Sequence, residues 1–364
     1  MNFKRYGRPA VFAIVAALAL SSCAANEGGT ASTDGAAAST LTGTLNAAGA
    51  SSAGAAQTAW IAAFQTANPD VTINYDPSGS GAGRKAFISG GTAFAGSDSY
   101  LSDEELAGTF KACAPTSKAV DLPVYISPIA VIFKVDGVKD LNVDPDTLAK
   151  IFAGTITTWN DPALVALNPD AQLPSTAITA VHRSDDSGTT KNFTDYLNQT
   201  APTVWTAKGA DTFPFQSGEG AQGTSGVVSA VTNGTGTIGY ADASQAGDLG
   251  TAKLKVGDKF VAHSAKGAAE VVAGSPLVEG RAADDLAVKI NRTTTNPEEY
   301  PLVLVSYALV CNEYADAKQG ALVKAYVEYL ASADGQKAAQ SAAGAAPLSA
   351  DLEAQVAAVL ATVK

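Results

Sequence analysis

Apolar and polar residues follow two periods along the chain, and the two periods succeed one another repeatedly. Short runs that are apolar at every second position, such as Val71, Ile73 and Tyr75, predict strands. Stretches with apolar residues three or four positions apart, such as the one containing Trp60 and Phe64, predict helices. Strands that alternate with helices are typical of α/β architecture with mostly parallel sheets.

These patterns assign most of the chain after residue 41. The expected strands are residues 42–48, 71–75, 93–97, 120–135, 176–181, 236–240 and 302–310. The expected helices are residues 60–64, 87–88, 144–152, 162–167, 225–232, 268–273 and 284–290, followed by Ala-rich amphipathic helix over 315–363. We expect Pro123 and Pro128 to break the long strand region, because proline cannot donate to a strand ladder.

The chain begins with the features of a secretory signal. Basic residues precede an apolar run at residues 11–20, which is too short for a typical membrane-spanning helix. The run leads into Leu20-Ser21-Ser22-Cys23, which resembles a bacterial lipobox and implies a diacylglyceryl anchor on Cys23. We therefore expect a signal peptide at residues 1–22 and a protein anchored by lipid to the outer face of the bacterial cytoplasmic membrane, whether extracellular or periplasmic.

The segment after the lipobox differs in composition from the rest. Residues 23–40 consist mainly of Ala, Gly, Ser and Thr, and they lack the large apolar residues that a core requires. This composition predicts a flexible linker between the lipidated Cys23 and the folded domain.

Two cysteines remain for the folded domain if Cys23 carries lipid. Outside the cytoplasm, an even pair favours a disulfide, and we expect a bond between Cys113 and Cys311. Two cysteines with two well-separated histidines, His182 and His263, cannot supply a usual zinc site, so no metal is expected.

The formal net charge of the 364 residues is −11. A surface of this sign repels nucleic acid and acidic lipid, and no nucleic-acid partner is expected. Any anion that binds here must do so through local dipoles and single cations. The series Gly218, Gly220 and Gly223 has dinucleotide-loop spacing, but the strand before it is short and contains proline, so no cofactor is expected either.

A turn rich in Ser and Gly precedes a predicted helix three times, at residues 49–54, 78–83 and 184–190. The first N–H groups of a helix have no partner within it, and the helix dipole makes that end partly positive. An anion is therefore a natural ligand there. Arg183 adds a planar fork that suits a tetrahedral oxyanion. The turns could also be independent helix caps, with Arg183 paired locally to Asp185.

Several segments together resemble PstS, the family of phosphate-binding proteins of bacterial high-affinity phosphate ABC transporters. The resemblance covers the chain from about residue 41 to the C-terminus and is densest at four segments: 94–98, 151–160, 183–189 and 236–240. It implies a type II periplasmic-binding-protein fold, with two α/β lobes, a ligand cleft and two crossover strands. It also implies two partners, inorganic phosphate and the membrane permease subunits of the transporter.

The resemblance implies the following lobes and crossovers. Lobe I would comprise residues 41–127 plus 303–364, and lobe II residues 128–302. Residues 124–133 and 302–310 are the candidate crossovers.

The resemblance also assigns site residues. Arg183, Asp185, Ser187, Gly188 and Thr189 fall on the family pattern Arg-x-Asp-x-Ser-Gly-Thr. Arg183 would grip phosphate oxygens while Asp185 orients its guanidinium group. Ser187, Gly188 and Thr189 would donate hydroxyl and backbone hydrogen bonds.

Two further loops carry the other expected phosphate ligands. Ser80 matches a serine in the family's second loop, and Asp98 matches the carboxylate that accepts a proton from the ligand. The first loop departs from the family's Gly-Ala-Thr-Phe-Pro. Ser51 keeps a hydroxyl group and Ser52 can keep a backbone donor, but the Phe and Pro that stiffen the loop are missing.

Three other functions stay open from the sequence. The chain could bind another tetrahedral oxyanion, since arsenate shares the chemistry of phosphate. A secreted phosphatase or hydrolase is disfavoured, because Ser187 has no evident base apart from His182. A surface lectin-like module is the third alternative, and it would bind without lobe closure.

Overall fold

A computed structural model describes residues 39–364. The expected signal peptide, Cys23 and nearly all of the expected linker lie outside the described residues. In the described range, no helix combines the length and apolar character needed to cross a membrane.

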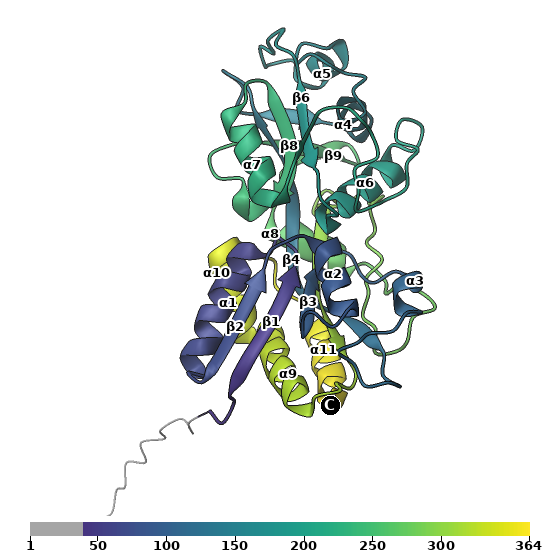
Figure 1. The fold of residues 1–364 in the computed structure, drawn as a ribbon. Coiled ribbons are helices and arrows are strands. Elements are labelled where there is room, and N and C mark those ends of the chain that lie inside the picture. The colour runs from purple at the N-terminus through teal and green to yellow at the C-terminus, as the bar shows by residue number, and fades with distance from the viewer. Residues whose placement is uncertain (1–38) are drawn as a thin grey trace, which may run out of the picture. The chain divides into compact units, whose positions relative to one another are not determined.

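The strands form two groups that share the long strand β4 (Ala119–Lys134) (Figure 1). The first group contains β1 (Gly43–Gly49), β2 (Val71–Asp76), β3 (Phe94–Ser97) and β11 (Val303–Cys311). The second group contains β5 (Leu141–Val143), β6 (Thr179–Arg183), β7 (Glu219–Ala221), β8 (Thr237–Asp242), β9 (Gly250–Val256) and β10 (Lys259–Val261). The strand order is β2-β1-β3-β11-β4-β8-β6-β7, and β9 pairs with β4, β5 and β10.

Helices accompany both groups. Those in sequence with the first group are α1 (Gly54–Ala67), α2 (Ser80–Ile88), α3 (Asp103–Leu106), α9 (Ala317–Ala331), α10 (Ala333–Ala343) and α11 (Ala350–Thr362). Those in sequence with the second group are α4 (Pro145–Phe152), α5 (Pro162–Leu167), α6 (Gly188–Thr200), α7 (Gly223–Asn233), the 3₁₀ turn η1 (Ala243–Gln245) and α8 (Ala265–Ala273). The alternation of strands and helices predicted from the sequence is confirmed.

Strand β4 changes partners along its length. Its first part pairs antiparallel with β11 up to Pro128, and from Ile129 onward it pairs antiparallel with β8. Nearly every residue of β4 and β11 is buried, which explains why both strands read as continuous apolar runs. The pairs β1–β2, β1–β3, β6–β7 and β6–β8 are parallel. The assignment of residues to two lobes stays a prediction.

The expectation that two prolines break the 120–135 region is wrong, because β4 is one strand. Pro128 lies where the strand changes partners, so its missing donor interrupts neither ladder. Near Pro123 the register shifts: Tyr125 pairs with Ser306, whereas Pro123 pairs with Tyr307. A bulge of this kind accommodates a proline and redirects neighbouring side chains.

The helix expected at residues 284–290 is also wrong. The backbone N–H of Leu286 donates to the carbonyl of Asp121, and that of Val288 donates to the hydroxyl of Tyr307. Tertiary partners therefore replace the intrahelical bonds that the apolar spacing suggested.

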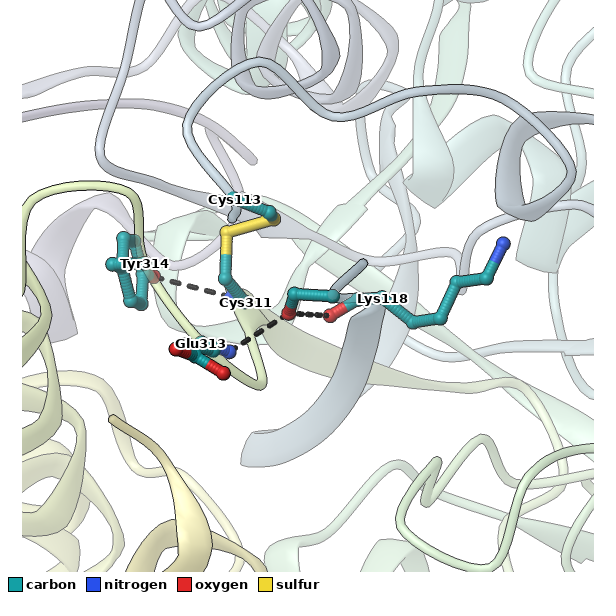
Figure 2. The surroundings of a disulfide bond; sticks show 6 residues. Cys113, Lys118, Cys311, Glu313 and Tyr314 are labelled. Carbon is teal, nitrogen blue, oxygen red and sulfur yellow. Dashed lines mark hydrogen bonds between the residues drawn. A yellow bond between two sulfur atoms is a disulfide. The ribbon is translucent and has the colours of Figure 1, made fainter. Parts of the chain in front are cut away.

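Cys113 and Cys311 form a disulfide, as the sequence predicts (Figure 2). Their Cα atoms lie 5.3 Å apart and 198 positions separate them in sequence. Beside the bond, the backbone N–H of Cys311 donates to the Tyr314 hydroxyl over 3.3 Å. The bond fixes the end of β11 to the loop that precedes β4.

Candidate anion-binding site

Each of the three Ser/Gly turns leads into a helix, as the sequence predicts. Helix α6 begins at Gly188 after the N-cap Ser187, whose hydroxyl oxygen accepts from the N–H of Thr190 over 3.1 Å. Helix α2 begins at Ser80 after Gly79, which has a φ of +102°. Helix α1 follows Ala53, which makes no side-chain cap bond. Two of the three helices thus begin without a side chain covering their first N–H groups.

Asp98 is the centre of the site. It follows β3 directly and is only 3% exposed. The hydroxyl of Ser52 lies 2.7 Å from both carboxylate oxygens, and that of Thr189 donates to Oδ2 over 2.9 Å. The hydroxyl of Ser306 donates to Oδ1. The carboxylate therefore acts as an acceptor for three hydroxyl groups that come from distant parts of the chain.

Burial raises the pKa of Asp98 above its ordinary value. The hydrogen bonds from Ser306, Ser52 and Thr189, together with the positive charge of Arg183, act in the opposite direction but do not cancel the effect of burial. Burial therefore makes the negative charge of Asp98 costly, and the three hydroxyl groups and Arg183 remove only part of that cost.

Two glycines allow the site's backbone segments to approach closely. A Cβ atom on Gly188 would lie 2.7 Å from the Ser80 hydroxyl oxygen and 2.8 Å from Cβ of Asp98. Such contacts are too short for any side chain, so only glycine fits between α2 and the Asp98 turn. A Cβ atom on Gly79 would lie 2.5 Å from Oδ2 of Asp185 and 3.5 Å from Nη2 of Arg183. Ser80, Asp98, Arg183 and Gly188 therefore lie around one small region.

Arg183 lies at the end of β6 with a nearly buried side chain. Its Nε donates to Oδ1 of Asp185 over 2.7 Å and its Nη2 donates to Oδ2, a bidentate pair. Burial raises the pKa of Asp185, but the hydrogen bond and charge of Arg183 outweigh burial, so the net pKa is lowered. Asp185 also accepts from the N–H of Gly223 over 3.0 Å. The glycine-rich loop before α7 therefore supports the Arg183–Asp185 pair.

Ser51 lies apart from the Asp98 carboxylate. Its hydroxyl is 3.0 Å from that of Thr224 and accepts from the Thr224 N–H over 3.1 Å. The side-chain amide of Gln245 donates to the carbonyls of Ser51 and Ser52, over 3.2 and 3.1 Å. The first loop, which lacks the family's Phe and Pro, is thus held by Thr224 on α7 and Gln245 on η1. Contact between Ser51 and a ligand stays a prediction.

Ser306 lies beside Asp98 in the candidate site, and the sequence pattern did not single it out. It is the one serine within the apolar run 302–310. A polar residue inside a fully buried strand needs a hydrogen-bond partner, and that requirement was the available signal. The register of β11 against β4 shifts between Ser306 and Tyr307. Ser306, whose hydroxyl donates to Asp98, therefore lies next to the bulge.

His182 and Ser187 have separate partners. The His182 ring stacks on Phe213 with ring centres 4.0 Å apart, and its Nδ1 lies 2.9 Å from the carbonyl of Arg183. The Ser187 hydroxyl caps α6 through Thr190. These contacts do not form a nucleophile with an adjacent base. Among residues 39–364, no group of three or more His, Cys, Asp or Glu is arranged to hold a metal ion.

Comparison with known proteins first defines the class. Residues 34–334 match the PBP superfamily domain. Phosphate-binding protein PstS 3 of Mycobacterium tuberculosis is 37% identical over 340 residues, which are 90% of this chain and 91% of that protein. PstS 2 of the same organism is 34% identical over 341 residues, again 90% and 91% of the two chains. The chain belongs to the PstS phosphate-binding proteins of the PBP superfamily, and the resemblance found in the sequence is confirmed.

Solved structures show the same fold. The high-affinity periplasmic phosphate-binding protein PfluDING, bound with phosphate, matches with a TM-score of 0.69 at 22% identity and covers 87% of this chain and 93% of its own. The phosphate-binding protein of Stenotrophomonas maltophilia matches with a TM-score of 0.65 at 20% identity, covering 88% and 93%. The type II periplasmic-binding-protein fold predicted from the sequence is confirmed.

Proposed function

We propose that this chain binds inorganic phosphate between its two groups of strands and delivers it to the permease subunits of a phosphate ABC transporter. The relatives that share about a third of its residues are named as phosphate-binding proteins, and these names describe binding rather than catalysis. A putative phosphate ABC transporter substrate-binding protein of Clostridium perfringens, solved with bound phosphate, has the same fold. The role is therefore transport without chemistry on the ligand.

The proposed ligand contacts follow from the chemistry of the site. Arg183 would bind phosphate oxygens, with Asp185 fixing the plane of its guanidinium group. The hydroxyls of Ser80 and Ser187 would donate to the ligand, as would the backbone N–H of Ser52 and the first N–H groups of α6 at Gly188 and Thr189. The Thr189 hydroxyl donates to Asp98 in the structure and would have to turn to reach the ligand. As an N-cap, Ser187 uses a lone pair, so its proton stays available for an anion.

The observation that carries the proposal is the buried Asp98. When its carboxylate is ionised, it accepts hydrogen bonds and has none to donate. At neutral pH phosphate carries a proton that it can donate to Asp98, whereas sulfate carries none. Two negative oxygens about 3 Å apart cost on the order of 5 kcal/mol at an effective dielectric near 20, or roughly a thousandfold or more in affinity. Asp98 would therefore reject sulfate although the two anions have nearly the same size.

We further propose that lipid on Cys23 holds the protein at the outer face of the cytoplasmic membrane. The Leu20-Ser21-Ser22-Cys23 segment supports this, and the linker at 23–40 would let the domain reach the permease. Mass spectrometry of the mature protein from membranes should show a diacylglyceryl modification on Cys23. An unmodified Cys23 in membrane-extracted protein would refute the anchor.

Isothermal titration of the mature domain tests the binding function. Phosphate should bind with measurable heat at neutral pH and arsenate should compete, because it presents the same protonated tetrahedral oxygen. Sulfate should compete at least a thousandfold less well. Equal binding of sulfate and phosphate, or no phosphate binding at all, would refute the proposal. Unchanged small-angle scattering on adding phosphate would favour a rigid binding module over a closing transporter subunit.

A further inference from the structure

Asn192 links the two sides of the anion site. It lies on α6, one turn after Gly188, and is buried. Its side-chain Nδ2 donates to the Asp98 carbonyl over 2.7 Å and to the Gly188 carbonyl over 2.9 Å. A single amide thus bridges the turn that carries the acid and the helix start that carries the anion donors.

Arg292 fixes the orientation of this amide. Its Nη2 donates to Oδ1 of Asn192. A guanidinium group can only donate, so Asn192 must turn its oxygen toward Arg292 and its two N–H bonds toward Asp98 and Gly188. The amide cannot reverse without placing its N–H groups against the Arg292 donors and its oxygen against the carbonyl oxygens of Asp98 and Gly188.

Arg292 is itself held on several sides. Its Nη1 donates to the carbonyls of Pro301 and Val303, over 2.9 and 2.7 Å, and its Nε pairs with Asp195 at 3.2 Å. Val303 begins β11, the strand that carries Ser306. One buried guanidinium therefore ties α6 to the strand whose hydroxyl also contacts the Asp98 carboxylate.

The backbone of Asp98 is thereby fixed at both of its polar groups. Its N–H donates to the Ser80 hydroxyl over 3.1 Å, and its carbonyl accepts from Asn192. Because both groups are held, the Asp98 carboxylate has little freedom to move relative to Gly188. Distinguishing a protonated from an unprotonated oxyanion requires this fixed position, because a displaced carboxylate leaves room for water between itself and the ligand.

We propose that Asn192, oriented by Arg292, is a positioning residue that holds Asp98 where it distinguishes protonated from unprotonated oxyanions. The inference rests on the proposed function, since it concerns the selectivity of the same site. Asn192 does not need to contact the anion. A cavity of about 370 Å³ is lined by Asp98, Asn192 and Arg292, so water can replace part of the lost bonding when Asn192 is changed.

The ratio of phosphate to sulfate affinity separates positioning from a structural role. Looser packing or weaker closure around the ligand would reduce both affinities in proportion. A displaced Asp98 reduces the penalty on sulfate, so the ratio itself falls. Phosphate at pH 8 and sulfate are both mainly dianions, and a charge introduced nearby therefore affects both to a similar extent.

The experiment uses two substitutions at Asn192 with a matched control. Asn192→Asp keeps the shape and the pair with Arg292 but removes both donors, and Asn192→Ala removes the whole amide. Asn198→Asp makes the same change on the same helix, where Nδ2 donates to the carbonyl of Trp205 over 3.1 Å. The sulfate concentration that displaces bound phosphate is measured for each protein at pH 8 together with the phosphate Kd.

Both Asn192 variants should lower the phosphate-to-sulfate ratio about tenfold or more, and Asn198→Asp should leave it within twofold of wild type. An unchanged ratio in the Asn192 variants would overturn the inference even if both affinities fell. Failure of both variants to fold would also overturn it, because Asn192 would then be structural. If wild-type protein binds no phosphate, the proposed function fails first, and that result is distinct from an unchanged ratio.

Discussion

At the scale of single residues, Asp98 combines burial with three hydroxyl donors and the field of Arg183. Replacing its carboxylate with an amide of the same shape should change the selectivity of the site between phosphate and sulfate. Asp98→Asn offers a donor as well as an acceptor, so an unprotonated oxygen no longer meets only negative charge. We expect sulfate to compete at least tenfold better against phosphate in this variant. Competition calorimetry measures the sulfate affinity relative to phosphate. If Asp98→Asn rejects sulfate as strongly as wild type does, Asp98 does not have the proposed role.

The raised pKa of Asp98 predicts a pH dependence of the same property. Burial favours the protonated acid, so lowering the pH toward a pKa above 3.8 converts Asp98 from an acceptor into a donor. Sulfate stays a dianion over this range and needs a donor. Its affinity should therefore rise as the pH falls from 7 toward 4, by up to about tenfold per pH unit for one linked proton. Asp98→Asn is the control, and its sulfate affinity should stay flat with pH.

The same sign applies to folding stability without ligand. A buried acid with a raised pKa stabilises the fold at pH values below the unfolded pKa, and this contribution is lost as the pH rises through the folded pKa. At neutral pH the ionised Asp98 is therefore a cost to the unliganded protein. A phosphate proton placed against the carboxylate offsets that cost.

At the scale of elements, the Ser/Gly turns contribute backbone donors only if their loops are held. The first loop lacks stiffening residues, and Gln245 on η1 donates to both Ser51 and Ser52. Gln245→Ala should weaken phosphate binding about three- to tenfold, because two carbonyls lose a donor and Ser52 gains freedom. Gln245→Glu should weaken it further, because a carboxylate faces those carbonyls. Calorimetry is compared with Gln340→Ala, an exposed position on α10, and equal affinities would contradict the role of Gln245.

The sequence predicted elements wherever local pattern and tertiary partners agree. The turn before α6 is an example, since Ser187 caps the helix as its sequence position indicates. The prediction from the sequence was wrong at residues 284–290, where backbone N–H groups donate to Asp121 and Tyr307 instead of forming intrahelical hydrogen bonds. Asn192 could not be found from the sequence, because helix packing fixes its partners and no local pattern encodes that packing. The partner of Ser306 depends on the register of β4 against β11, but a serine inside an apolar strand already indicates a buried hydrogen bond.

At the scale of the whole molecule, the site is assembled from segments far apart in sequence, and β4 is shared by both groups of strands. Ser52, Asp98, Thr189 and Ser306 meet only when these groups are in place. Ligand affinity and fold stability are therefore separable properties. The former depends on contacts around Asp98, and the latter depends on the core and on the covalent bond at the far end of β11.

The disulfide provides a test of that separation. Cys113 and Cys311 close a loop of 198 positions, and removing such a bond costs about 2–5 kcal/mol through the greater freedom of the unfolded chain. The double variant Cys113→Ser with Cys311→Ser leaves no unpaired thiol in the folded domain. It should melt several degrees lower in a calorimetric scan, yet bind phosphate within about twofold of wild type at 25 °C, because neither cysteine contacts Asp98 or Arg183 in the described part of the chain. A large loss of phosphate affinity in a variant that is still folded at that temperature would show that the end of β11 controls the position of Ser306, and the two properties would then be coupled.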